Sequence, residues 1–432
     1  MSRRRLGSLL VLLVVVSLVA SACGTTPEPQ EPVVITATPG AVEEMSWQDL
    51  PAIKIGAPVI LTGPGAPIGA DTVAGIELAV KSINDAGGVL GKPLEVIYAD
   101  TKMTSAEDAT LAAEVLDRSG VVAFFPGTAY GPALVHAFGK FQQPLWHTLA
   151  QEAATEAYQQ APEEYSNIFQ LCETEPAYGQ NGFKLLSTLP YEFPNKKVAI
   201  LGGDITYDML IGETFREEAE AAGWEVILDD TYAYGNTEFG AQLAKIRAED
   251  PAIIWGDITS VDSAVAFMNQ FLQDPTNSLV YIQWAPNAPQ FIELLGDKAN
   301  GVIWQTLIAG LPTAESEAFH NEFVETQGRE PGATMPYQMW DNLYMWKAAV
   351  EACKSPVDYT CIVDWFEKLD DHPYKGLMGT YGMDPVRHNA RTGDEWLPIH
   401  FIQIQDQENH ILNLGTKKME GEEWIVPPWI EQ

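Results

Sequence analysis

The chain has 432 residues, of which 46% are hydrophobic, and a mean hydropathy of −0.07. These values predict a folded protein with a sizeable core and two or three domains. The formal net charge of −34 argues against nucleic acid as a partner, because binding to phosphates requires clustered Lys and Arg. We interpret the charge as a solvated acidic surface that favours solubility.

The N-terminus has the features of a secretory signal peptide. Arg3, Arg4 and Arg5 precede an apolar run at residues 9–16, and small residues follow at 20–22. A basic start, a short apolar segment and small residues before a cleavage site are typical of such a signal. The apolar run is too short for a permanent membrane span. We therefore expect residues 1–22 to direct export.

Cys23 comes directly after these small residues, and the arrangement resembles a bacterial lipobox, although Ala20 stands where Leu is commoner. The resemblance implies cleavage before Cys23 and attachment of lipid to its sulfur and amino group. Residues 23–50 are rich in Pro, Thr and Glu and lack any helical or alternating pattern. We expect them to form a disordered tether that holds the folded body off a membrane surface.

The folded body opens with a strand–loop–helix–strand unit. Residues 53–61 are apolar and rich in β-branched side chains, and the Gly and Pro residues of 63–69 predict a loop. A helix follows, in which apolar residues recur on one face: Val73, Ile76, Val80 and Ile83. Residues 94–98 predict the next strand. Such a unit is typical of a parallel sheet, which binds ligands at the carboxyl ends of its strands.

The alternation continues through the first lobe. A helix that begins near Ser105 is predicted to place Leu111, Val115 and Leu116 on its apolar face. Residues 121–126 and 144–148 predict the third and fourth strands. Four strands with helical crossovers complete one open α/β lobe.

A second lobe follows in the same order of strand, polar or Gly-bearing loop, and helix. A short strand at residues 168–171 leads into it, and its own strands are predicted at 197–201, 224–229, 253–256 and 280–284. We then expect the chain to return to the first lobe with a strand at 301–307, three helices between 316 and 369, and a closing pair of strands at 396–413. The predicted lobes comprise residues 51–171 with 301–381, and residues 172–300 with 382–432.

Three cysteines remain besides Cys23. Cys353 and Cys361 flank a short loop, and export permits a disulfide between them, which would stabilise the fold by about 2–3 kcal/mol. Cys172 would then be a buried, unpaired thiol. The chain has no CxxC motif and no Cys/His cluster, so we expect neither a metal site nor a cofactor.

Three groups of motifs carry a resemblance to a known family. They are IKIGAPVILTGPGAPIG with GIELAVKSINDAGGVLGKPLEV, YGNTEF with AQLAKIRAEDPAII, and GLMGTYGMD. From about residue 53 to 389 the chain resembles the extracytoplasmic substrate-binding proteins of branched-chain amino acid and amide ABC transporters, the leucine/isoleucine/valine-binding family. The resemblance implies a type I periplasmic-binding fold, with two lobes joined by three hinge crossings near Cys172, Gly301 and Tyr381.

The resemblance also implies where a ligand binds in the first lobe. Similar proteins hold a ligand carboxylate with N–H and hydroxyl groups at helix N-termini, where the helix dipole favours an anion. By motif, this surface comprises Thr128, Ala129, Tyr130, Leu149, Ala150 and Gln151. Amino-acid binders favour Ser near the first segment and Ala-Thr in the second, so Thr128, Tyr130 and Gln151 would have to supply the contacts. The alternative is an ordinary helix entry without a ligand.

Four further residues are implied at the ligand. Tyr207 matches an aromatic position of the family, although Asp208 replaces Gly after it, and it is either a cleft wall or a surface Tyr. Thr259 follows a predicted strand where relatives place a cleft residue. Glu175 would either pair with a ligand amino group or cap a helix. Trp284 stands where branched-chain amino acid binders carry a Glu, and it suits an aromatic, amide or larger apolar ligand, or a cation over its face.

We therefore expect a solute-binding component of an ABC importer. It would be a lipid-anchored monomer outside the cytoplasm that closes on a small molecule and delivers it to a membrane permease. The alternative is a sensor module that reports ligand occupancy to a separate signalling partner. An enzyme is not expected, because Ala129 occupies the nucleophile position of the elbow-like stretch 127–131, and the chain has no HExxH.

Overall fold

The computed structural model describes residues 46–63, 65–102, 105–127 and 131–431. The chain divides into two units, residues 1–45 and 46–432, and the description concerns the second. The predicted signal peptide, Cys23 and nearly all of the predicted tether lie outside the described residues. Within the end of the predicted tether, η1 (Trp47–Asp49) forms a short 3₁₀-helix.

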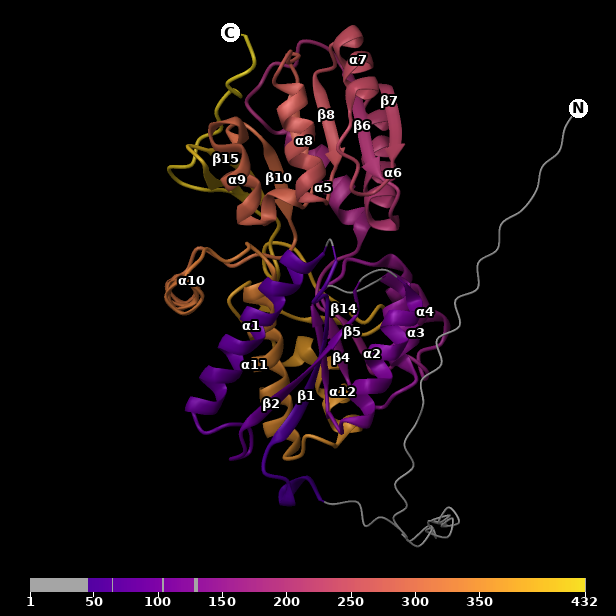
Figure 1. Ribbon diagram of the computed structural model, residues 1–432, viewed down its shortest axis with the longest axis vertical. Helices are drawn as coiled ribbons and strands as arrows, with labels where there is room; N and C mark the ends of the chain where they lie inside the picture. Colours follow the sequence, from indigo (N-terminus) through magenta and orange to yellow (C-terminus); the bar gives the residue numbers. More distant parts are fainter. Residues whose placement is uncertain (1–45, 64, 103–104, 128–130, 432) are drawn as a thin grey trace, which may run out of the picture. The chain divides into compact units, whose positions relative to one another are not determined.

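The first lobe is built on a seven-stranded sheet with the order β13-β14-β5-β4-β3-β1-β2 (Figure 1). Neighbouring strands from β5 to β2 are parallel, and β13 runs antiparallel to β14. The strands are β1 (Ile53–Val59), β2 (Leu94–Asp100), β3 (Phe124–Gly127), β4 (Leu145–His147), β5 (Ile168–Gln170), β13 (Met383–Asp384) and β14 (Asn389–Ala390).

Helices from two distant parts of the sequence accompany this sheet. They are α1 (Ala66–Asp85), α2 (Ala106–Arg118), α3 (Gly131–Gly139), α4 (Glu152–Gln160), α10 (Ala314–Gln327), α11 (Met335–Cys353) and α12 (Tyr359–Glu367). A small hairpin, β11 (Tyr374–Lys375) with β12 (Thr380–Tyr381), and η4 (Leu369–Asp371) follow α12.

The second lobe has an eight-stranded sheet with the order β17-β16-β15-β10-β9-β8-β6-β7. Its strands are β6 (Lys197–Gly203), β7 (Glu225–Tyr232), β8 (Ile253–Asp257), β9 (Leu279–Ile282), β10 (Ile303–Thr306), β15 (His400–Gln405), β16 (Glu408–Leu414) and β17 (Lys417–Lys418). Its helices are α5 (Glu175–Ser187), α6 (Thr206–Ala221), α7 (Gly240–Glu249), α8 (Val261–Phe271) and α9 (Pro289–Leu295), with the short η2 (Ala285–Asn287) and η3 (Gly296–Ala299). The architecture is the predicted two-lobed α/β fold.

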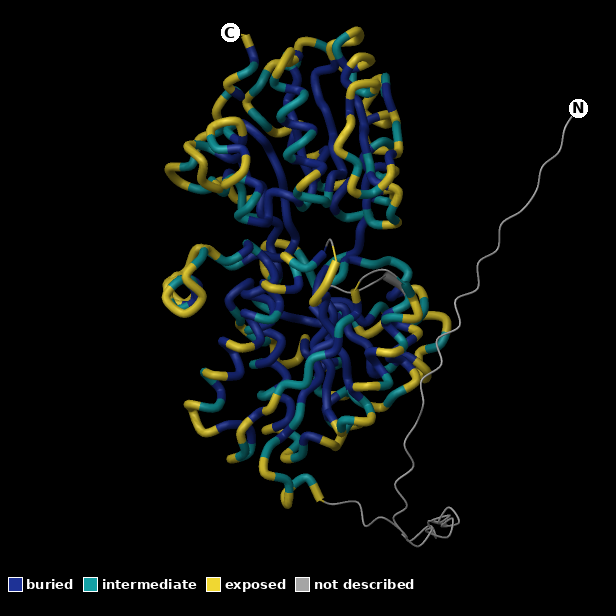
Figure 2. The backbone as a smooth tube through the Cα atoms, viewed as in Figure 1, coloured by how far each residue is buried: buried dark blue, intermediate teal, exposed yellow. Residues whose placement is uncertain are grey.

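Most strand residues of both sheets are buried, whereas exposed residues gather on the helices and loops (Figure 2). In α1, Ile76, Val80 and Ile83 are buried as predicted, and Val73 packs against the same core. The helix α1 lies so close to α11 that an ideal Cβ at Gly75 would come within 2.7 Å of the Cα atom of Pro336 in α11. A small residue at this position therefore lets the two helices pack closely.

The predicted face of α2 is wrong for two of its three residues. Leu111 and Val115 are 51% and 44% exposed, and only Leu116 is buried. The buried face is formed instead by Ala109, Ala112, Ala113 and Leu116, which follow the same helical spacing with smaller side chains. Small residues face the sheet here, so the larger apolar residues mark the wrong side of the helix.

Two predicted crossings are also displaced along the chain. β10 pairs with β9 and β15, so residues 301–306 belong to the second lobe and the second crossing follows at 307–313. The β13–β14 hairpin pairs with β5 in the first lobe, which moves the third crossing from near Tyr381 to residues 391–399. The first crossing, at residues 171–174, agrees with its predicted place near Cys172.

Cys353 and Cys361 form a disulfide with a Cα–Cα distance of 5.9 Å, which joins the end of α11 to α12. Cys172 is a free, buried thiol in the first crossing. Burial raises its pKa well above the ordinary thiol value, so the group stays protonated and unreactive.

Candidate ligand-binding site

Each sheet has one point at which the direction of strand addition reverses. In the first sheet, β1 lies between β2 and β3, and in the second sheet, β6 lies between β7 and β8. Open parallel sheets bind ligands beyond the carboxyl ends of the strands at such a switch point, because the two following loops diverge and leave a crevice. The topology thus directs attention to the loops after β1 and β3 and to those after β6 and β8.

In the first lobe, three of the six predicted residues are described. Leu149, Ala150 and Gln151 connect β4 to α4, with Ala150 buried and the other two partly exposed. The Gln151 N–H donates to Gln170 Oε1 over 3.1 Å, which fixes the start of α4 beside β5. Thr128, Ala129 and Tyr130 lie outside the described residues, so their role stays a prediction.

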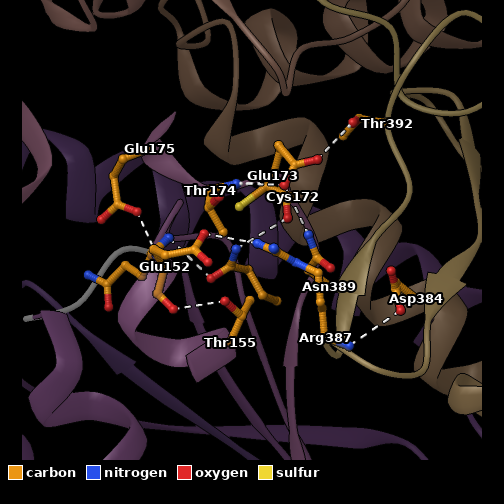
Figure 3. A network of polar contacts seen from close by, with 12 residues as sticks. Glu152, Thr155, Cys172, Glu173, Thr174, Glu175, Asp384, Arg387, Asn389 and Thr392 are labelled. Carbon is orange, nitrogen blue, oxygen red and sulfur yellow. Dashed lines mark hydrogen bonds and ion pairs between the residues drawn. The ribbon is translucent and has the colours of Figure 1, made fainter. Parts of the chain in front are cut away.

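Glu175 begins α5 directly after the first crossing and is only 2% exposed. Its Oε2 accepts a hydrogen bond from the Glu152 N–H over 2.6 Å (Figure 3), so the carboxyl group caps α4 of the first lobe. Burial raises the pKa of Glu175 to about 7, and the nearby Glu152 and Glu156 carboxylates add to the rise. The residue joins the start of α5 to the loop that contains Gln151.

Tyr207 lies in the first turn of α6, after the carboxyl end of β6, and is half-buried. Gln283 Nε2 donates to the Tyr207 hydroxyl over 2.8 Å, and the Tyr281 hydroxyl donates to Gln283 Oε1. The Tyr178 ring meets the Tyr207 ring edge to face at 5.9 Å between centroids. The orientation of Tyr207 is therefore set by buried neighbours, of which Tyr178 and Gln283 were missed by sequence reasoning.

Trp284 follows β9 and has φ 68° and ψ −46°, a backbone conformation that costs energy for any residue with a Cβ. The Ala285 N–H donates to Gln283 O over 2.9 Å, which closes a γ-turn around Trp284. The ring is half-buried and contacts Tyr207 at 6.4 Å between centroids. Strained residues of this kind concentrate at functional sites, which makes Trp284 the most informative residue of this edge.

Two buried carboxyl groups lie beneath this surface. Asp208 follows Tyr207 and is 1% exposed, and Asp257 ends β8 and is fully buried. The Gly203 N–H and the Thr259 hydroxyl donate to Asp208 Oδ2, and Trp255 Nε1 donates to Asp257 Oδ2.

Burial raises the pKa of both carboxyl groups well above the ordinary value. A neighbouring acid adds to each rise: Asp204 raises the pKa of Asp208, and Asp208 raises the pKa of Asp257. Neither group has an ion-pair partner among the described residues. Glycine makes room for them, because an ideal Cβ at Gly203 would come within 2.5 Å of Asp208 Oδ2. Sequence reasoning noted Asp208 only as a departure from the family pattern and missed Asp257.

The structure therefore assembles two groups of predicted residues. The first group, Tyr207, Thr259 and Trp284, lies at the carboxyl edge of the second sheet. The Tyr207 and Trp284 rings are in contact, and the Thr259 hydroxyl donates to Asp208, the residue after Tyr207. Gln151 and Glu175 come together where α4 meets the first crossing. A hollow of about 260 Å³ lies on the first lobe between the start of the loop after β1, α1 and Gln327, and none of the predicted site residues lines it.

The fold and its two switch-point edges define a two-lobed binding protein. In the part of the chain that the structure describes, no group of three or more His, Cys, Asp or Glu residues is arranged to hold a metal ion. Over the same residues, no helix is both long and apolar enough to cross a membrane.

Comparison with known proteins identifies the family. A family model described as "Periplasmic binding protein" matches residues 52–405, so the chain belongs to that family, whose members act outside the cytoplasm. A crystal structure from Silicibacter pomeroyi, provisionally described as a branched-chain amino acid ABC transporter, superposes with a TM-score of 0.79 at 28% identity. The match covers 88% of this chain and 100% of that one.

More distant matches share the fold. The branched-chain amino acid transporter substrate-binding protein LivJ from Streptococcus pneumoniae, solved with isoleucine, has a TM-score of 0.72 at 21% identity and covers 87% of this chain and 100% of its own. A solute-binding protein from R. palustris, solved with benzoate, has a TM-score of 0.68 at 17% identity and covers 87% and 99%.

Among curated proteins, Leu/Ile/Val-binding protein homolog 1 from Brucella suis is 22% identical over 214 residues. This stretch is 49% of this chain and 55% of that protein, so the chain spans about half the length of the curated relatives it matches.

Proposed function

We propose that this protein is the solute-binding component of an ABC importer, which captures a small molecule between its two lobes and delivers it to a membrane permease. Membership of the periplasmic binding protein family supports the proposal. The observation that carries it is the pairing of Tyr207 with the strained Trp284 at the switch-point edge of the second sheet. Capture is the whole activity in this proposal, without a chemical step.

Closure of the two lobes would convert ligand binding into a signal for the permease. A ligand that touches both lobes stabilises the closed state by its extra contacts, and the three crossings absorb the rotation. In the first lobe, we assign Thr128, Ala129, Tyr130, Leu149, Ala150 and Gln151 to the ligand. In the second lobe, Tyr207, Thr259 and Trp284 complete the surface, while Glu175 supports it by capping α4.

The ligand is an amino acid, an amide or a related small molecule in this proposal. Two structures similar in fold were solved with isoleucine and with benzoate, so this fold accommodates both aliphatic and aromatic ligands. The Trp284 ring favours a flat or apolar group, or a cation over its face. A lipid on Cys23 and the segment up to residue 50 would keep a monomeric protein near the permease.

A thermal-shift screen tests the proposal. The panel contains amino acids, amides, aromatic acids and polyamines, and we expect one class to raise the melting temperature, because a ligand that binds only the folded state stabilises it. Trp284→Ala and Tyr207→Ala should abolish that rise. Trp365→Ala is the matched control, because Trp365 is also half-buried but lies in α12, away from both switch points.

The two outcomes are distinct. A ligand that still stabilises both variants as strongly as the parent protein would place the binding site elsewhere. A panel in which no compound changes the melting temperature would count against a solute-binding role for this class of ligands.

A further inference from the structure

The loop between α10 and α11, residues 328–334, contacts both lobes. Both flanking helices belong to the first lobe, and the loop is attached there to α1. At its other side, the Ala333 N–H donates to Asn287 O over 3.2 Å, and Asn287 is the last residue of η2 in the second lobe. The loop is thus a contact between lobes that is separate from the three crossings.

Asp71 holds the loop on α1. Its residue exposure is 6%, its Oδ1 lies 2.5 Å from Arg329 Nη1, and its Oδ2 accepts the Gly332 N–H over 3.2 Å. The Arg329 guanidinium also lies over the Phe323 ring, 5.2 Å from its centroid. A buried carboxylate needs such partners, because an unpaired charge in this position would cost several kcal/mol. Asp71 and Arg329 therefore fix the path of the loop.

Gly332 shows how closely the loop is held. An ideal Cβ at this position would overlap Asp71 Oδ2 and would come within 3.5 Å of Asn287 O. The backbone passes between a carboxylate of the first lobe and a carbonyl oxygen of the second. Movement of the loop away from α1 would therefore also change its contact with Asn287.

Asn287 in turn closes the turn that contains Trp284. The Asn287 N–H donates to Trp284 O over 2.8 Å, and the Ala288 N–H donates to Ala285 O over 3.2 Å. The strained φ of Trp284 persists only if its surroundings enforce it. The hydrogen bond from Ala333 fixes the carbonyl of the residue that ends this turn, so the loop is one of the contacts that enforce it.

We propose that Asp71 and Arg329 are positioning residues for Trp284: they hold the loop 328–334 against Asn287 and thereby maintain the strained turn in the second lobe. Neither residue touches the ligand in this proposal. The first lobe thus sets the orientation of an aromatic wall in the second lobe. An effect of this arrangement on ligand selection rests on the proposed function. The coupling between the loop 328–334 and the turn at Trp284 does not depend on that function.

Hydrogen exchange measured by mass spectrometry on the full chain without any ligand tests the coupling. The reporter peptide spans residues 284–288, whose amides at Ala285, Asn287 and Ala288 all donate within the turn. We expect Asp71→Ala and Arg329→Gln each to accelerate its exchange by about 10-fold, because the turn opens more often when the loop is released. In Arg329→Gln, the Asp71 carboxyl loses its ion pair but takes up a proton more readily, because burial raises its pKa and Arg329 no longer opposes the rise, so this variant folds even if Asp71→Ala is impaired.

Asp85→Ala is the matched control. Asp85 is also an α1 aspartate in an ion pair at 2.5 Å, with Lys81, but both partners are exposed and neither contacts the loop. In the Asp85→Ala variant, the reporter peptide 284–288 should exchange at the wild-type rate.

Acceleration confined to residues 328–334 in the Asp71 and Arg329 variants, with the reporter peptide unchanged, would overturn the proposal. No acceleration at all would overturn it equally. A failed ligand screen would refute the proposed function but would leave this result unaffected.

Discussion

The Thr392 hydroxyl donates a hydrogen bond to Glu173 Oε2 over 3.0 Å, although the two residues are 219 positions apart (Figure 3). Glu173 lies in the first crossing and Thr392 in the third. Asn389 Nδ2 donates to the other oxygen, Oε1, over 3.1 Å. One half-buried carboxylate thus joins two of the three connections between the lobes.

Glu173→Ala should destabilise the fold by about 1–3 kcal/mol, because its carboxylate accepts three hydrogen bonds that are lost, from Thr392, from Asn389 and from the Thr174 N–H. Chemical unfolding followed by circular dichroism measures the change. Glu395→Ala is the control, since Glu395 lies in the same third crossing but is exposed. Equal stability of the two variants would mean that Glu173 does not hold the crossings together.

Glu175 should make stability depend on pH. Its pKa is raised to about 7 in the folded protein from an ordinary value of 4.5, chiefly by burial, so the folded state holds the proton more tightly than the unfolded state. The stabilisation is complete below pH 4.5 and is lost as the pH rises through 7. The full effect is on the order of 3 kcal/mol.

Melting temperatures of the wild type and of Glu175→Gln between pH 4.5 and 8 check this expectation. The Gln side chain still accepts the Glu152 N–H but does not ionise, so the variant should gain stability relative to the wild type as the pH rises. Glu163→Gln, at an exposed position nearby in the sequence, should show no such gain. Parallel curves for the wild type and Glu175→Gln would contradict the raised pKa.

The two adjacent glycines at the end of β6 should respond differently to substitution. Gly203→Ala should cost about 1–3 kcal/mol, because the new methyl group would come within 2.5 Å of Asp208 Oδ2, which two hydrogen bonds hold in place. Gly202→Ala should be nearly neutral, since its methyl group would find only ordinary contacts, at 3.7 Å or more. Thermal melts of both variants measure the two losses of stability. Equal losses would mean that the Asp208 side chain is not held in place and can move away from the new methyl group.

Substitution of Trp284 should reveal its backbone strain. Both Trp284→Gly and Trp284→Ala remove the ring, but only Gly adopts φ 68° without a steric cost, so the Gly variant should be the more stable by about 1–2 kcal/mol. At Trp365, inside α12, the order should reverse, because Gly is the poorer helix former by about 1 kcal/mol. Unfolding free energies of the four variants test both expectations, and a Trp284→Ala variant as stable as its Gly counterpart would remove the argument from strain.

The sequence by itself determined the alternation of strands and helices up to residue 300 and the buried face of α1. Both depend on local patterns: the spacing of apolar residues has period 3.6 in helices, and short apolar runs bounded by Gly and Pro indicate strands. Tyr207 and Trp284 were predicted at the ligand from the family resemblance, and both follow strands at the carboxyl edge of a parallel sheet, where ligands bind.

Only the tertiary structure decided which sheet each late strand joins, and therefore where the second and third crossings lie. Strand pairing depends on partners far away in the chain, as β10 with β15 and β14 with β5 illustrate. The same reason applies to Asp71, whose contact with Gly332 spans 261 positions. A local pattern carries no record of such contacts, because their energy arises only when the folded chain brings the two groups together.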